Sequence, residues 1–142
     1  MKYSPYIFVV LAAGLLIYFG FSSEKFSNTS QDKWETKVDG QPPVTIQVTP
    51  VEFGKSSKQW KFDVVFTTHS GSLDDDPVKI ALLMDNNGNI SQPIAWEGPG
   101  PGGHHREGVL IFNPIKPLPK YVELKIKNVG DVPERSFRWD LK

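Results

Sequence analysis

Cysteine is absent from this chain of 142 residues. Without a thiol the protein forms no disulfide, no Cys-ligated zinc or iron–sulfur centre and no acylated cysteine of the lipoprotein type. The chain also has no net charge, since 16 basic residues balance 16 acidic ones. A nucleic-acid partner needs a basic stripe to neutralise phosphates, and the sequence has none. We therefore expect no nucleic-acid partner.

Common catalytic motifs are also missing. The sequence has no G-x-S-x-G elbow, no GxxxxGK[ST] phosphate loop and no HExxH pair. Ser70 follows His69 directly, but adjacency in sequence does not make a nucleophile and its base. We therefore expect a protein that is not an enzyme.

One long apolar run is present, at the N-terminus. Residues 6–21 read YIFVVLAAGLLIYFGF, without a charged side chain. Extending the run back to Tyr3 brings it close to the ~20 residues that cross a bilayer as a helix, and tyrosines near its ends suit the headgroup level. Residues 1–21 are thus predicted to form a transmembrane helix that anchors the chain, or a secretory signal that is cleaved. The first alternative gives a single-pass membrane protein and the second a secreted one. Both place the remainder outside the cytoplasm.

A polar stretch at residues 22–33 follows and is interpreted as a tether. The rest, residues 34–142, is expected to fold as one domain. Apolar and polar residues alternate with a period of two, which is typical of half-buried strands. The clearest such segments are residues 44–49, 60–67, 121–127 and 136–141.

The middle of the domain follows a different pattern. Residues 78–84 (VKIALLM) are apolar on both faces, as expected for a central strand, and the Asn-Gly turn in residues 85–89 predicts a hairpin whose partner strand is residues 90–96. The run GPGPGG at residues 98–103 is predicted to be a loop, and residues 108–112 a short strand. No segment after residue 33 has helical periodicity. This pattern predicts an all-β fold: an antiparallel sandwich of seven strands or so.

From residue 43 to residue 141, the alternation resembles that of the immunoglobulin- and fibronectin-like sandwich domains that accompany bacterial envelope proteins. The resemblance implies a fold and no specific function. It favours a module that binds another envelope protein or a wall component through its end loops.

The three histidines suggest an alternative. His104 and His105 follow the glycine-rich loop and His69 ends a predicted strand, so all three are candidate ligands for zinc or copper(II). Neighbouring residues on a strand face opposite ways, so His104 and His105 can share an ion only if the loop continues through them. The competing interpretation is a structural polar cluster in which Arg106 pairs with a carboxylate.

Partner binding has its own candidates, Trp96 and Arg106, which flank the glycine-rich loop. Trp60 and Trp139 fall on the apolar face of alternating strands and are predicted to be core residues. Arg138 and Asp140 are predicted to lie on a solvated face.

Overall fold

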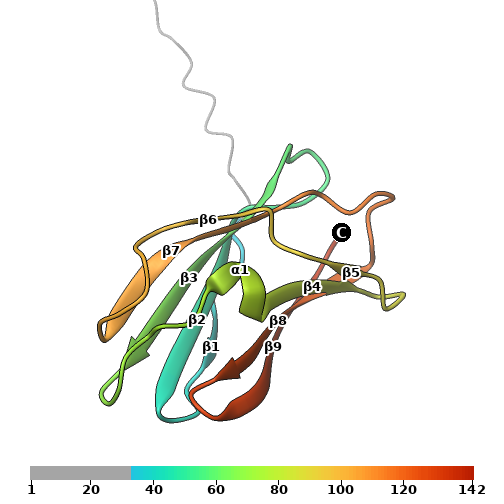
Figure 1. Ribbon diagram of the computed structural model, residues 1–142. Coiled ribbons are helices and arrows are strands. Elements are labelled where there is room, and N and C mark those ends of the chain that lie inside the picture. The colour runs from blue at the N-terminus through green and yellow to red at the C-terminus, as the bar shows by residue number, and fades with distance from the viewer. Residues whose placement is uncertain (1–32) are drawn as a thin grey trace, which may run out of the picture. The chain divides into compact units, whose positions relative to one another are not determined.

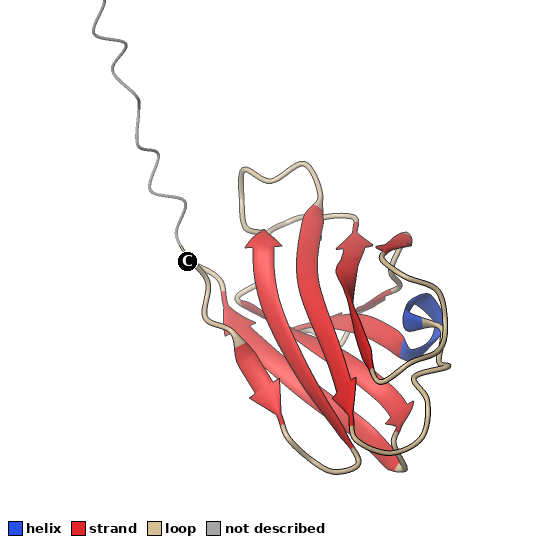
Figure 2. Cartoon of the chain, turned by 90° about the vertical axis from the view of Figure 1, so that its left-hand side faces the viewer, coloured by secondary structure: helices blue, strands red, loops and turns tan. Residues whose placement is uncertain are grey.

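The computed structural model describes residues 33–142, which fold into two antiparallel sheets (Figure 1). The first sheet has the strand order β1-β2-β3-β7-β6 and the second the order β5-β4-β8-β9. The strands are β1 (Lys37–Asp39), β2 (Val44–Glu52), β3 (Trp60–Thr68), β4 (Ala81–Asp85), β5 (Ile90–Ser91), β6 (Ala95–Glu97), β7 (His105–Phe112), β8 (Tyr121–Val129) and β9 (Val132–Asp140). One short helix, α1 (Pro77–Ile80), precedes β4 (Figure 2).

The core lies between the two sheets and explains the alternation in the sequence. Residues in phase along each strand are buried, among them Ile46, Phe62, Leu124 and Trp139. Within the described domain, every buried core side chain belongs to residues 44–139, so this part of the chain holds the contacts that a β-sandwich needs to fold by itself. The predicted all-β fold with two antiparallel sheets is confirmed.

The sandwich has two ends with different loops (Figure 1). We call one the far end; it carries the turns at residues 40–43, 69–76, 98–104 and 130–131. We call the other the terminal end; it carries the loops at residues 53–59, 86–89 and 113–120. The domain also begins and finishes there, because the Trp139 indole donates to the Glu35 carbonyl (2.8 Å) and the Leu141 amide to the Lys120 carbonyl (2.8 Å).

The predicted strands at residues 44–49, 60–67, 121–127 and 136–141 correspond to β2, β3, β8 and β9. The hairpin at residues 85–89 is confirmed, since Met84 pairs with Ile90 on β5. The Asp85 carboxylate shapes this turn by accepting hydrogen bonds from the backbone amides of Asn87 (2.8 Å) and Asn89 (2.9 Å). The Asn89 side-chain amide donates as well, and these bonds lower the pKa of Asp85 despite the opposing effect of burial.

Two strand predictions were wrong in part. Residues 77–80 form a helical turn, and the central strand begins only at Ala81, because Asp76 caps the turn and Pro77 suits its first position. Residues 90–96 do not make one strand: β5 stays with β4, while β6 crosses to the other sheet and pairs with β7. Pro93 lies between β5 and β6, and proline cannot continue a ladder of hydrogen bonds. Counting these short pieces, the described chain has nine strands.

The predicted membrane segment at residues 1–21 and the tether up to residue 32 lie outside the described residues. From residue 33 onward, no helix has the length and apolar character needed to span a bilayer.

Candidate functional site

A buried arginine, Arg106 on β7, organises the loops of the far end. Its side chain is in phase with Leu110 and Phe112 and therefore faces the interior, where the residue is only 4% exposed. One guanidinium nitrogen donates to the carbonyls of Leu73 (2.9 Å) and Asp75 (2.6 Å), and the other donates to the carbonyl of Pro99 (3.2 Å). These three bonds hold the loops at residues 69–76 and 98–104 against each other.

Backbone bonds complete this connection. The Leu73 amide donates to the Gly103 carbonyl (3.0 Å), and the Gly102 amide donates to the Leu73 carbonyl (2.9 Å). The buried Thr68 hydroxyl donates to the Pro43 carbonyl (2.9 Å) and so ties in the turn at residues 40–43. The far end is thus a platform of loops that are fixed in advance. Such a surface loses little conformational entropy when it binds a partner.

Trp96 forms the side wall of this platform and is partly buried. Its indole donates to the Pro99 carbonyl (3.0 Å), and its ring lies 5.8 Å from the Arg106 guanidinium carbon. Glycine is needed beneath the ring, since a Cβ on Gly98 or on Gly108 would lie 2.7 Å from it. Both predicted partner-binding residues are therefore brought together, with Arg106 beneath the loops and Trp96 partly accessible beside them.

The cavity that the described residues form beneath the platform is too small for a ligand. The cavity beside Arg106 has a volume of about 10 Å³, room for about one water molecule. Its lining includes Phe66, Leu73, Ile80 and Val129. The far end is therefore suited to binding across its surface.

Acidic side chains dominate the surface of the far end. The turns at residues 40–43, 69–76, 98–104 and 130–131 contain four aspartates and neither lysine nor arginine. Asp76 caps α1 through the Val78 amide (3.1 Å), and Asp74 accepts from the Ser72 hydroxyl (2.8 Å). Asp75 and Asp131 are exposed and form no ion pair with a described residue.

The three histidines occupy different settings. The loop ends at His104, whose carbonyl accepts from the Thr68 amide (2.9 Å), and His105 already belongs to β7. The ring of His105 lies 3.3 Å from the Thr67 hydroxyl and 3.6 Å from the Glu107 carboxylate. In the described part of the chain, no three His, Asp or Glu side chains are placed to hold one ion. Zinc or copper(II) binding by His69, His104 and His105 stays a prediction.

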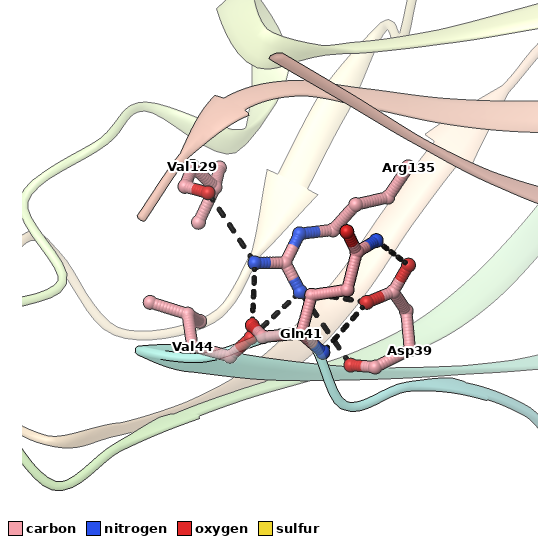
Figure 3. Close-up of polar contacts among 5 residues, drawn as sticks. All are labelled: Asp39, Gln41, Val44, Val129 and Arg135. Atoms are coloured by element: carbon pink, nitrogen blue, oxygen red, sulfur yellow. Dashed lines mark hydrogen bonds and ion pairs between the residues drawn. The ribbon is translucent and has the colours of Figure 1, made fainter. Parts of the chain in front are cut away.

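A second buried arginine, Arg135 on β9, links the sheets at the far end (Figure 3). Its guanidinium forms an ion pair with Asp39 (3.0 Å) and donates to the carbonyls of Val44 (2.6 Å), Gln41 (3.0 Å) and Val129 (3.3 Å). Burial acts to raise the pKa of Asp39, but the Gln41 amides and the Arg135 charge outweigh it and lower that pKa.

Sequence reasoning missed the role of Arg135, although a signal was present. Arg135 shares its phase along the strand with Phe137 and Trp139, just as Arg106 does with Leu110 and Phe112. A charged residue in the apolar phase indicates a buried group whose charge is compensated by hydrogen bonds. Arg138 and Asp140, in the opposite phase, pair with each other at 2.9 Å on the exposed face, as predicted. Trp60 and Trp139 are core residues, also as predicted.

The larger hollows lie at the terminal end, on either side of the loop at residues 113–120. One has a volume of about 420 Å³ and is lined by Asn86, Asn87, Lys116 and Lys120 among others. The other, of about 250 Å³, includes Lys55 and Trp60 in its lining. Sequence reasoning assigned no role to this end.

No family model matches the sequence, and comparison with curated proteins and with solved structures found no match.

Proposed function

We propose that this protein is a membrane-tethered interaction module outside the cytoplasm, built on an immunoglobulin-like sandwich, and that it binds another protein of the cell envelope through its far end. The anchor in this proposal is the apolar segment at residues 1–21. Cleavage of that segment would give the same module in secreted form.

One observation carries the proposal: the preorganised platform around Arg106 lies at the end opposite to the point where the chain enters the domain. Two loops and a β-turn are fixed there by the Arg106, Leu73 and Thr68 hydrogen bonds. A tether that joins the domain at the terminal end leaves the far end as the part most accessible to a partner. Loops on a rigid scaffold are where binding residues concentrate.

The charge of the platform indicates which kind of partner surface it binds. Its loops offer two exposed aspartates that form no ion pair with a described residue, Asp75 and Asp131, together with the partly buried ring of Trp96. Charges of opposite sign across an interface steer association and exclude wrong partners. The partner surface is therefore expected to carry lysine and arginine side chains.

Site-specific photo-crosslinking tests this proposal in cells that produce the full chain. A benzophenone amino acid replaces Gly100, where an added Cβ meets nothing within 4 Å. The matched control replaces Gln47, an exposed residue on the outer face of β2. We expect a defined adduct from position 100 and none from position 47, and we expect Asp75→Lys/Asp131→Lys to abolish it.

Two results would contradict the proposal. Adducts that form from position 47 but not from position 100 would place the interaction on the sheet face. A full-length product that is recovered in the cytosol would remove the tether and its location. Alkaline washing of membranes separates a cleaved, secreted form from an anchored one.

A further inference from the structure

Unpaired lysines gather at the terminal end. Eleven lysines lie in residues 33–142, and five of them form ion pairs on strands or on α1: Lys37, Lys61, Lys79, Lys125 and Lys127. The remaining six are exposed, pair with no described acidic residue, and all belong to the terminal end: Lys33, Lys55, Lys58, Lys116, Lys120 and Lys142.

Acidic groups near this end do not cancel that charge. Glu35 pairs with Lys37 (2.7 Å), Glu52 with Lys61 (2.9 Å) and Asp140 with Arg138 (2.9 Å). The Asp85 carboxylate is buried and already accepts amide hydrogen bonds within its own hairpin. The loops at residues 53–59 and 113–120 contain four lysines and no acidic residue. The domain is thus polarised, positive at the terminal end and negative at the far end.

Packing against the core and one hydrogen bond hold the backbone of the loop that carries Lys116 and Lys120. Within the loop at residues 113–120, Ile115 and Leu118 pack against the core, while Lys116 and Lys120 stay exposed. The Lys120 amide donates to the Asn86 side chain (2.7 Å), which joins this loop to the β4–β5 hairpin. The 420 Å³ hollow between them is lined by asparagine amides and by Lys116 and Lys120, whose N–H groups can bind phosphate oxygens, and by Asp85, whose carboxylate accepts hydrogen bonds from Asn87 and Asn89.

We propose that the terminal end docks on the anionic phosphate headgroups of a lipid bilayer. The described structure begins at residue 33, which lies at this end, so the apolar segment at residues 1–21 is connected to the domain through the end that bears the lysines. Juxtamembrane lysines are attracted by the negative surface potential of anionic lipids. Docking would orient the acidic far end away from the bilayer. This inference concerns a different surface from the one that the proposed function uses.

The strength of binding to the bilayer can be measured on the domain without residues 1–32. Each lysine near an anionic surface contributes about fivefold to the partition coefficient, and the attraction falls off within a Debye length of about 8 Å at physiological salt. Residues 33–142 contain the core that joins the two sheets, so this fragment is suitable for sedimentation with vesicles. We expect it to bind vesicles that contain phosphatidylglycerol, to ignore vesicles of phosphatidylcholine alone, and to dissociate in high salt.

Two double variants test whether the lysines of the terminal end bind the bilayer. Lys116→Gln/Lys120→Gln should lower the partition coefficient by about 30-fold, from the contribution per lysine given above. The control, Lys79→Gln/Lys127→Gln, removes the same charge from ion-paired lysines elsewhere and should change it by less than about threefold. Circular dichroism confirms that both variants keep the β fold.

A second experiment uses the full chain. Because the protein has no cysteine, Ser56→Cys at the terminal end and Gly100→Cys at the far end each accept a single fluorophore. Headgroup quenchers in anionic vesicles should dim the first label and not the second. Equal dimming, binding that the Lys116/Lys120 change leaves intact, or binding of soluble polyphosphate without binding of vesicles would overturn the inference. None of these readouts depends on the far-end partner, so failure here is distinguishable from failure of the proposed function.

Discussion

The Arg135 guanidinium on β9 lies 3.0 Å from the Asp39 carboxylate on β1, 96 residues earlier in the chain. The two strands are edge strands of different sheets. This ion pair therefore closes one side of the sandwich, and the added bonds to the carbonyls of Gln41 and Val44 fix the turn between β1 and β2 (Figure 3). The platform at the far end depends in part on this closure.

Replacing Arg135 by methionine should strongly destabilise the domain. The change removes a fully buried charge and leaves Asp39 and three carbonyl groups without their donor, at a cost of about 3–5 kcal/mol. Chemical denaturation of residues 33–142 measures the loss of unfolding free energy. Arg138→Met is the matched control, because Arg138 is exposed and its loss should cost less than about 1 kcal/mol. Equal losses for the two variants would refute the assigned role.

Low pH should weaken the ion pair between Arg135 and Asp39. Because the pKa of Asp39 is lowered in the folded state, its contribution to stability is complete above the ordinary value of 3.8 and is lost as the pH falls through the lowered pKa. Asp39→Asn carries no titrating group and should lose less unfolding free energy than the wild type between about pH 5 and 2. Parallel curves for the two proteins would show that Asp39 does not contribute to the acid sensitivity.

The close approach of Trp96 to β7 predicts a sharp difference between two glycines. A Cβ on Gly108 would lie 2.6 Å from the Glu97 carbonyl oxygen and 2.7 Å from the Trp96 ring. Gly108→Ala should therefore cost about 1–3 kcal/mol and shift the tryptophan emission as the ring moves. Gly100→Ala, with nothing within 4 Å of its Cβ, should change stability by less than about 0.5 kcal/mol. If Gly108→Ala changed neither the stability nor the tryptophan emission, the result would contradict this packing.

Metal titration decides the histidine hypothesis. Zinc or copper(II) binding by His69, His104 and His105 would appear in calorimetry as micromolar affinity that His104→Ala/His105→Ala abolishes. Because no three His, Asp or Glu side chains in residues 33–142 are placed around one ion, such binding would require the loop at residues 98–104 to rearrange. Micromolar binding that survives the double substitution would remove these two residues from the hypothesis.

The alternation of side chains was sufficient to predict four of the strands. In β2, β3, β8 and β9, burial follows the period of two because each strand has one face on the core. The Asn-Gly turn was predictable for a similar reason, since its backbone requirement is local: Gly88 has a φ of 82°.

Pairing between distant strands was not predictable in this way. Nothing local in residues 90–97 shows that β5 joins β4 while β6 joins β7, because the choice depends on which sheet edge is open. The helical turn at Pro77 was hidden by an apolar run, although its cap, Asp76, is a recognised signal.

By itself, the sequence determined that the domain is all-β, which residues face its core, and that no thiol chemistry is available, because these follow from the type and spacing of neighbouring side chains. Only the tertiary structure decided that Arg106 and Arg135 are buried anchors, and that Asp75 and Asp131 lie at the end opposite to the unpaired lysines. Each of these depends on residues far apart in the chain, whose proximity is set by sheet topology and not by local pattern.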